Sequence, residues 1–307
     1  MELSLPPIIE FLNLTAECER EGVERAIGLR QVDLELGREE WLVLAGEYGS
    51  GPSLLARLAA GMLDPSVSLR SGELLHEGSD LLTASRRMRS ELRRRSITFL
   101  SAGLDQEIEP DRTVAQWLVD AAFLLGRQRE LRDPQARLEL LAEVGIFEAE
   151  TVLSHPMGSI TNLMRRRLSL IPLILGPTRL LICEHVTAPL DRFGEWQFIA
   201  LLRHLRSKYR FAILMAMERL SEVVVWADRV VVFYEGGVLE AGPASEIISQ
   251  PRFEYTRSLM ACQPRLENGR TTLPVPSREA IREAEEAVHR QSIGAVKVDQ
   301  ESPEATG

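Results

Sequence analysis

Lysine is almost absent from this chain. Lys208 and Lys297 are the only lysines among its 36 basic residues, so a site that needs a lysine ammonium group has just two candidates. Cysteine is also scarce, and Cys18, Cys183 and Cys262 lack the close spacing of metal ligands. Cys183 lies in an apolar run and is expected to be a core residue. The sequence therefore gives no sign of a cysteine-ligated metal site.

Long hydrophobic runs are missing as well. The longest, from Leu168 to Leu175, is interrupted by Pro172 and is far too short to span a bilayer. No signal-peptide pattern is present, so a cytoplasmic location is expected, with any work at a membrane done through a partner. The 307 residues, 45% of them hydrophobic, suffice for one large domain or two small ones.

Positive charge is in deficit over the whole chain. The net charge of −9 and a pI near 5.3 argue against a nucleic-acid-binding surface. Arginines nevertheless gather in three runs with a helical pattern: Arg86-Arg87-Met88-Arg89, Arg93-Arg94-Arg95 and Arg165-Arg166-Arg167. We interpret these runs as solvated or partner-facing helices rather than as an RNA-binding surface.

A glycine-rich loop is the most informative feature that is present. The run Gly46-Glu47-Tyr48-Gly49-Ser50-Gly51-Pro52-Ser53 follows an apolar strand at 41–45 and precedes a helix that begins near Ser53. It matches the pattern G-x-x-x-x-G-K-[ST], except that Pro52 replaces the lysine. In such a loop, successive backbone N–H groups and a helix N-terminus face phosphate groups. The alternative interpretation is a glycine-rich turn that binds no ligand.

Pro52 removes two donors from this loop. It lacks the ammonium group of lysine, and proline has no backbone N–H. Because proline is readily accommodated at the first position of a helix, the fold should survive. A charge-assisted hydrogen bond contributes roughly 1.5–3 kcal/mol, so phosphate binding is expected to weaken by about a hundredfold or more. Neither lysine of the chain lies near a candidate nucleotide motif that would restore the charge.

Strands alternate with helices along the chain, which predicts a mostly parallel α/β sheet. Strands are expected at 8–14, 32–36, 41–45, 72–78, 96–100, 180–183, 211–215, 229–234 and 238–242. Helices are expected at 53–62, 84–95, 194–208 and, with breaks at Pro134, Gly145 and His155-Pro156, over 114–175. After about residue 263 the composition is polar, which predicts one helix over 278–290 followed by disorder.

The order of these pieces resembles the ATP-binding subunits of ABC transporters, most closely the dipeptide/oligopeptide group that includes Sap-type peptide transporters. The resemblance covers roughly residues 8–262. It rests on five segments: Gly46-Glu47-x-Gly49-Ser50-Gly51-x-Ser53-Leu54, Leu180-Leu181-Ile182 with Leu190-Asp191, Ala227-Asp228-Arg229-Val230, Tyr234-x-Gly236, and Tyr255-Thr256-Arg257-Ser258-Leu259. The cysteine cluster that many members carry further on is missing.

The resemblance implies a P-loop NTPase fold. This fold has a RecA-like core, an antiparallel β subdomain and a helical subdomain, which is expected at about 111–178. The resemblance places the ABC-type nucleotide-binding domain in residues 1–262 and a polar tail in 263–307. It also implies a nucleotide-binding loop, with the residues Gly46, Gly49, Ser50, Gly51, Pro52, Ser53 and Leu54, and a retained D-loop aspartate, Asp191. The glutamine of the family's Q-loop falls near Ala102, and its adenine-stacking aromatic residue falls at about Cys18.

The catalytic positions depart from the family pattern. Glu184 takes the position of the Walker B aspartate, His185 that of the catalytic glutamate, and Glu218 that of the switch histidine. The resemblance implies ATP and Mg²⁺ as cofactors, with Ser53 and Glu184 as metal ligands. Because the site loses a lysine and a histidine and gains a carboxylate, we expect weak or absent binding. His185 is either a base or simply a polar residue at a strand end.

The signature loop is altered too. The family's L-S-G-G-[MQ] reads Ser159-Ile160-Thr161-Asn162-Leu163, so that Thr161 and Asn162 replace the two glycines. In this family, subunits pair head to tail, and each site joins one subunit's phosphate loop to the other's signature. Because this chain departs from both motifs, both composite sites of a pair that contains it are expected to be impaired.

The leading hypothesis is a catalytically impaired transporter subunit with a structural or regulatory role. It would form a heterodimer with a second ATP-binding subunit beneath two permease subunits, peripheral on the inner face of the plasma membrane, in the transport of peptides or other small solutes. One alternative is an atypical active ATPase, which Ser53, Glu184, Asp191 and the preserved glycines support. Another is a soluble ABC-fold adaptor that uses the 264–307 tail as a contact element. No nucleic-acid partner is expected.

Overall fold

The structure is a computed structural model, and it describes residues 6–20, 23–62, 64–103, 109–218, 220, 222–261 and 276–298. The expectations for Cys262 and for disorder at the C-terminus concern residues outside this described part. The chain divides into two compact units. The first comprises Met1–Ala84 and Leu214–Gly307, and the second comprises Ser85–Ile213. Each unit is described by itself.

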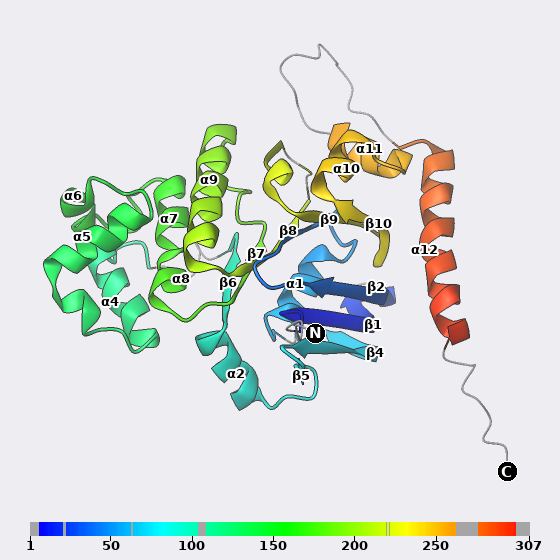
Figure 1. Cartoon of the computed structure of the whole chain (residues 1–307), viewed down its shortest axis with the longest axis horizontal. Coiled ribbons are helices and arrows are strands. Elements are labelled where there is room, and N and C mark those ends of the chain that lie inside the picture. The colour runs from blue at the N-terminus through cyan, green and yellow to red at the C-terminus, as the bar shows by residue number, and fades with distance from the viewer. Residues whose placement is uncertain are drawn as a thin grey trace, which may run out of the picture. The chain divides into compact units, whose positions relative to one another are not determined.

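An antiparallel sheet forms one part of the first unit. Its strand order is β2-β1-β4-β5, and its strands are β1 (Ile9–Arg20), β2 (Val23–Leu36), β4 (Val67–His76) and β5 (Ser79–Asp80) (Figure 1). Phe11 in β1 lies opposite Leu34 in β2 and Leu74 in β4. All three side chains are buried, so apolar residues in register hold these strands together.

Strands β1 and β2 are longer than the sequence predicted. We expected the first strand to end at residue 14 and the second to begin at residue 32. Instead, pairing continues, and buried Ala16 lies opposite Leu29 in β2 and Leu69 in β4. Several register shifts interrupt the pairing. Such bulges break the period-two pattern that identifies a strand, which explains why the prediction stopped early.

The other sheet of the first unit combines parallel and antiparallel strand pairs. Its strands are β3 (Trp41–Ala45), β8 (Ala212–Met217), β9 (Arg229–Tyr234) and β10 (Gly237–Pro243), in the order β10-β9-β3-β8. Strand β8 begins in the last two residues of the second unit. β3 and β9 are parallel, with Val43 opposite Val230. Every residue of β3 and β8 is buried, which is why both read as continuous apolar runs.

Helices complete the first unit. They are α1 (Pro52–Ala59), α10 (Ala244–Ser249), α11 (Glu254–Ala261) and α12 (Arg278–Val298), with a 3-10 turn, η2 (Glu222–Trp226). Helix α12 begins where the sequence predicted and runs further. Its Ala280, Ala284 and Val288 lie four residues apart and are at most 5% exposed. This stripe is the packed face of α12, which contacts β2, β9, β10 and α11 (Figure 1).

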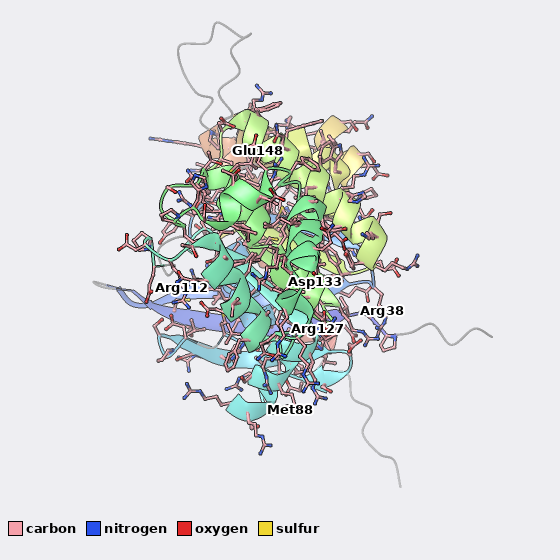
Figure 2. All side chains as sticks on the ribbon, turned by 90° about the vertical axis from the view of Figure 1, so that its left-hand side faces the viewer. Arg38, Met88, Arg112, Arg127, Asp133 and Glu148 are labelled. Carbon is pink, nitrogen blue, oxygen red and sulfur yellow. The ribbon has the colours of Figure 1, made fainter. Side chains whose placement is uncertain are left out.

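The second unit combines two parallel strands with most of the helices. β6 (Ile97–Ser101) pairs with β7 (Leu180–Glu184), so that Leu100 lies opposite Cys183 and Ser101 opposite Glu184. The helices are α2 (Arg86–Arg95), α4 (Val114–Leu124), α5 (Pro134–Glu143), α6 (Ala149–Leu153), α7 (Asn162–Leu168), α8 (Ile171–Leu175) and α9 (Arg192–Tyr209), with a 3-10 turn, η1 (Glu130–Arg132). Figure 2 looks onto α4 to α6.

The helix breaks fall where the sequence predicted them. Pro134 is the first residue of α5, Gly145 follows α5 with φ +78°, and His155 and Pro156 lie between α6 and α7. Cys183 is fully buried, and its burial raises the pKa of the thiol, which confirms the expected core role. Within the described residues, no helix combines the length and the hydropathy needed to cross a bilayer.

Candidate functional site

Two glycines fix the backbone of the phosphate loop in the first unit. Gly46 is buried at the end of β3, where an added Cβ would lie 2.9 Å from the Phe233 carbonyl oxygen. Gly51 has φ +124°, and an added Cβ would lie 3.2 Å from side-chain atoms of Leu29 and Phe233. The loop therefore requires glycine at both positions, for space at Gly46 and for both space and conformation at Gly51.

Pro52 occupies the first position of helix α1, as the sequence predicted. Gly51 is the N-cap residue, and its carbonyl accepts a hydrogen bond from the Leu55 N–H at 3.0 Å. The proline is buried. Since the first N–H of a helix has no partner within the helix, proline disturbs no helical hydrogen bond here. The position of Pro52 is therefore compatible with the local helix geometry.

The donors of Ser50 point into the loop itself. Its backbone N–H and its Oγ both donate to the Glu47 carbonyl oxygen, at 3.0 Å and 2.7 Å. Its carbonyl accepts from the Gly236 N–H at 2.9 Å, which ties the loop to the β9–β10 turn. Two groups that would otherwise face a ligand are thus engaged by a neighbouring carbonyl in this conformation.

A tyrosine pair lies beside the same loop. The rings of Tyr234 and Tyr255 meet edge to face with centroids 5.0 Å apart. Tyr255 is 2% exposed, and burial together with the charge of Glu47 raises the pKa of its phenol. Burial also raises the pKa of Tyr234, and three nearby carboxylates add to that effect: Glu235, Glu285 and Glu47. The surroundings of the loop therefore carry negative charge.

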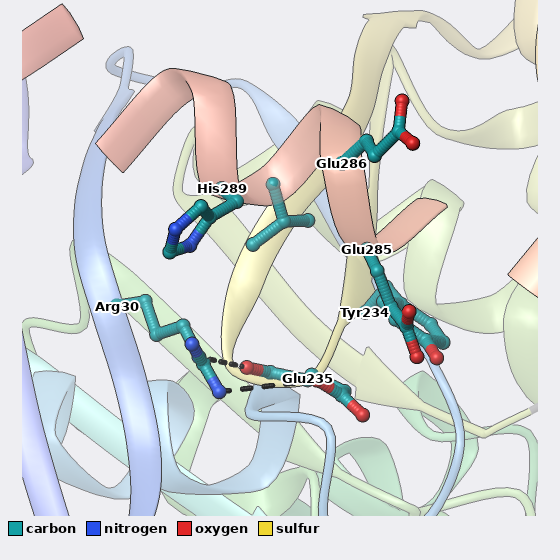
Figure 3. A pocket seen from close by; sticks show the side chains of 7 residues that line it. Arg30, Tyr234, Glu235, Glu285, Glu286 and His289 are labelled. Atoms are coloured by element: carbon teal, nitrogen blue, oxygen red, sulfur yellow. Dashed lines mark hydrogen bonds and ion pairs between the residues drawn. The ribbon is translucent and has the colours of Figure 1, made fainter. Parts of the chain in front are cut away.

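A pocket of about 330 Å³ opens between helix α12 and the β9–β10 turn. It is lined by Arg30, Tyr234, Glu235, Glu285, Glu286, Val288 and His289. Arg30 donates from its backbone N–H to the Gly236 carbonyl oxygen at 2.8 Å and from Nε to the Glu235 carbonyl oxygen at 2.9 Å. Figure 3 shows Arg30 reaching the Glu235 turn from β2, with Glu285, Glu286 and His289 projecting from α12. More carboxylates than cations line this pocket.

Glu184 lies in the second unit, at the end of β7. Its side chain is 4% exposed, and its backbone carbonyl accepts from the Ala102 N–H at 2.9 Å. The next residue, His185, has φ +50°, which is unusual for a residue other than glycine. Because Ala102 directly follows β6, the predicted Walker B and Q-loop positions lie side by side.

Arg166 corrects one of our expectations. We expected the three arginine runs to be solvated or to face a partner, but Arg166 is only 1% exposed. Its Nη1 donates to the Ser101 carbonyl oxygen and its Nη2 to the Ala102 carbonyl oxygen, each at 2.8 Å. The planar guanidinium thus binds two adjacent carbonyls at the end of β6. A helical pattern of charges alone could not distinguish this buried arginine from its partly exposed neighbours, Arg165 and Arg167.

Side chains close the signature segment of the second unit. Ile160 is buried, and Thr161 is the N-cap of α7, where its Oγ1 accepts from the Met164 N–H at 3.2 Å. Asn162 donates from Nδ2 to the Pro189 carbonyl oxygen at 3.1 Å. Ser159 is exposed and donates from Oγ to the Pro156 carbonyl oxygen. The two positions that the resemblance assigned to glycine therefore carry side chains that make local contacts.

The remaining predicted positions occupy element ends. Asp191 is the N-cap of α9, and its Oδ1 accepts from the Gly194 N–H at 2.6 Å. Ser53 and Leu54 lie in the first turn of α1 and are partly exposed, and Glu218 is exposed directly after β8. Cys18 is half-buried in β1, against Gly28 of β2. Loop residues 46–54 and Glu218 thus belong to the first unit, and the other predicted site residues of 102–191 belong to the second.

The sequence profile described as ABC transporter matches residues 29–188. This chain belongs to the ABC transporter family. Its curated relatives include the peptidoglycan transport ATP-binding protein YejF of Agrobacterium fabrum, 28% identical over 267 residues, which are 87% of this chain and 49% of that protein. The oligopeptide transport ATP-binding protein AmiE of Streptococcus pneumoniae is 27% identical over 246 residues, 80% of this chain and 69% of AmiE. This chain therefore spans about half the length of the first of these relatives.

Solved structures agree with the family assignment at the level of the fold. CbiO1 from Clostridium perfringens, part of an ABC transporter complex, aligns with a TM-score of 0.66 and 22% identity over 80% of this chain and 91% of that one. A dimeric ATP-binding cassette in a post-hydrolysis state, bound to ADP and Pi, aligns with a TM-score of 0.63 and 16% identity. The alignment covers 77% of this chain and 98% of that one. The predicted P-loop α/β fold of this ABC-family chain is confirmed.

Proposed function

We propose that this chain is an ATP-binding-type subunit of a peptide or small-solute ABC transporter and that it is catalytically impaired. It acts as the structural or regulatory partner of a second ATP-binding subunit, beneath two permease subunits on the inner face of the plasma membrane. The names of its relatives support the transporter role. The proposal places the nucleotide-binding domain in residues 1–262, its helical subdomain in about 111–178, and a polar tail in 263–307.

One observation carries the proposed impairment: Pro52, in the phosphate loop, is the first residue of α1. A nucleoside triphosphate needs hydrogen-bond donors and cations around its phosphate groups. Here the lysine is replaced, one N–H is lost with it, and the Ser50 N–H is bound to the Glu47 carbonyl. The residues present therefore fit ATP and Mg²⁺ poorly, although Ser53 and Glu184 retain oxygen atoms that could bind the metal.

The negative charge around the loop supports the same conclusion. Glu47 belongs to the loop, and its charge reaches both Tyr234 and Tyr255. A phosphate group that entered the loop would meet this carboxylate without the usual lysine to offset it. Two like charges about 4 Å apart repel by roughly 1–4 kcal/mol, depending on the local dielectric.

The second unit supports impairment at the signature loop. Thr161 and Asn162 stand where the family carries its two glycines, and Thr161 is the N-cap residue of α7. A side chain at each of these positions would obstruct the close approach of a partner's phosphate groups.

Exposed aromatic side chains of the second unit support docking on a permease. Phe147 is 84% exposed at a pocket of about 440 Å³ between α5 and α6, and Phe123 at the end of α4 is 68% exposed. Solvent-exposed aromatic residues beside a hollow are typical of protein interfaces. The solute itself would be selected by the permease and its binding protein.

Calorimetric titration of the full chain with MgATP tests the impairment. We expect no detectable binding by the native protein below about 1 mM, a standard free energy weaker than roughly −4 kcal/mol. Pro52→Lys should gain binding, because the loop backbone is otherwise intact. Pro65→Lys adds the same charge at an exposed turn and should not. Micromolar binding by the native protein would contradict the proposal.

An atypical active ATPase is the second candidate. It is favoured by the loop geometry at Gly46 and Gly51, by the retained Ser53 and Asp191, and by Glu184, which keeps a carboxylate at the Walker B position. Steady MgATP turnover that disappears in both Ser53→Ala and Glu184→Ala would establish it. The soluble adaptor stays a prediction as well, and membrane fractionation distinguishes it from the other two, since an adaptor would be recovered only in the soluble fraction.

A further inference from the structure

Helix α2 concentrates positive charge on an acidic protein. Six of its ten residues are arginine, and Glu91 is its only acidic residue. The helix therefore carries a formal charge of +5, whereas the whole chain carries −9, so the rest of the chain carries −14. Glu91 forms an ion pair with Arg95 at 3.0 Å. The remaining arginines outnumber the carboxylates of their own helix by a wide margin.

The fold does not use α2 to fill its core. No residue of the helix is buried, and Arg86, Arg87, Arg94 and Arg95 are exposed. Ser85 caps the helix through its Oγ, which accepts from the Met88 N–H at 3.2 Å. The α2 arginines therefore lie on a capped helix at the surface. Arg166, in contrast, is buried in the packing of its unit.

Like charges face one another on this helix. Arg86, Arg89 and Arg93 follow at spacings of three and four residues, which places them on one face. Partial burial lowers the pKa of the Arg93 guanidinium, and the charges of Arg89 and Arg86 lower it further. Such a row weakens an isolated helix, and a polyanionic partner would offset the repulsion.

The arginines of α2 are chemically suited to bind phosphate groups. Guanidinium groups bind phosphate oxygens in bidentate fashion, which ammonium groups do not. Met88, which is labelled in Figure 2, is 47% exposed on the same helix. An apolar side chain among cationic ones is typical of helices at a lipid interface. A pI near 5.3 is unlike that of nucleic-acid-binding domains.

We propose that α2 is a membrane-contact helix whose exposed arginines bind the phosphate groups of anionic lipids. This contact would hold the α2 face of the second unit against the bilayer in addition to any contact with a permease. It goes beyond the proposed function, because it requires neither nucleotide nor partner subunit. The chain alone should therefore show it, whether or not ATP binds.

Flotation of the full chain with lipid vesicles tests the proposal. We expect binding to phosphatidylcholine vesicles that contain about one third phosphatidylglycerol, and release as salt rises from about 50 to 300 mM. Vesicles of phosphatidylcholine alone should not bind. Replacing Arg86, Arg87, Arg94 and Arg95 by Gln should lower the affinity by at least about tenfold. The matched control replaces Arg127, Arg129, Arg132 and Arg203 by Gln, four exposed arginines outside α2, and should keep the native affinity.

Several results would overturn the proposal. They are no binding to anionic vesicles, equal losses in the α2 and control variants, and binding that does not depend on lipid charge. Tight binding of a single-stranded oligonucleotide without vesicle binding would assign the patch to nucleic acid instead. Circular dichroism checks that both variants fold. If the α2 variant does not fold, the double variant Arg87→Glu with Arg94→Glu gives the same test with fewer changes, since both side chains are exposed.

Discussion

At the scale of single residues, Arg166 is the most consequential side chain outside the predicted motifs. It joins α7 to the end of β6 through two carbonyls, and its charge lies close enough to Cys183 to oppose the effect of burial on that thiol's pKa. The neighbouring Ala102 also donates to the Glu184 carbonyl. One buried arginine therefore contacts the segment in which the sequence predicts the Q-loop position, beside the predicted Walker B position.

Arg166→Met should destabilise the second unit substantially. The variant keeps most of the side-chain volume but removes the donors of two part-buried hydrogen bonds to carbonyl oxygens, a loss of roughly 3 kcal/mol. Arg129→Met, at an exposed position, is the control and should change stability by less than about 0.5 kcal/mol. Urea unfolding followed by circular dichroism measures both. Equal stabilities of the two variants would show that the guanidinium contributes nothing to the fold.

Tyr255 predicts how stability depends on alkaline pH. An unfolded tyrosine ionises near pH 10, whereas burial and Glu47 raise the pKa of Tyr255 in the folded chain. Between these two pKa values the unfolded state binds fewer protons, so stability falls as pH rises, by at most about 1.4 kcal/mol per pH unit from this group. Below the unfolded pKa the contribution is fully present.

Tyr255→Phe should therefore lessen the loss of stability between about pH 9 and 11. Tyr48→Phe removes a hydroxyl from a ring that is 89% exposed and should leave the pH profile unchanged. Both variants retain Cys183, whose raised pKa acts in the same direction, so the difference between them isolates Tyr255. Unfolding free energies from urea titrations across this range give the measurement. Parallel profiles for native and Tyr255→Phe protein would refute the argument.

At the scale of elements, helix α12 turns a polar tail into part of the first unit. Its Ala284 is 0% exposed, and Val288 lies so close to Gly237 of β10 that no side chain fits there. The helix also lines the pocket beside the phosphate loop. The tail segment that the adaptor hypothesis offered to a partner is therefore packed against its own chain through one face.

Ala284→Asp should release α12 from this face. A carboxylate at a fully buried position has no partner prepared for it, so the helix is expected to detach instead of burying the charge. Limited trypsin digestion should then cut faster at Arg282 and Arg290, with cleavage of the second unit unchanged. Glu283→Asp changes an exposed neighbour and serves as the control. Identical cleavage rates in both variants would mean that α12 is not held by this contact.

Some elements could be predicted from the sequence because local patterns specify them. The buried strands β3, β7 and β8 read as apolar runs, the β9–β10 hairpin turns at Glu235-Gly236, and Pro134 and Gly145 break the helices where expected. The full length of β1 could not be predicted, because bulges interrupt its alternation. The approach of Glu47 to Tyr255 joins residues about 200 positions apart, and no local pattern records such a contact.

At the scale of the whole molecule, the family assignment and the altered residues have to be explained together. The fold matches ABC cassettes along most of the chain. The substitutions fall on Pro52, Glu184, His185 and Glu218, which are the positions assigned to chemistry. The proposed function joins the two observations, because a scaffold that lacked these catalytic groups would serve assembly, in which surfaces matter more than turnover.

Purification from native membranes in mild detergent tests that role. A tagged form of this chain should bring down a second ATP-binding subunit and two permease-type membrane proteins in stoichiometric amounts. Any residual ATP turnover of the complex should be lost when the phosphate-loop lysine of the second subunit is replaced, and should be unaffected by Pro52→Ala in this chain. The lysine replacement acts on the intact loop, whereas Pro52→Ala restores no cation. Turnover that depends on this chain's Ser53 and Glu184 would instead establish the atypical ATPase, and recovery of the chain alone from the soluble fraction would favour the adaptor.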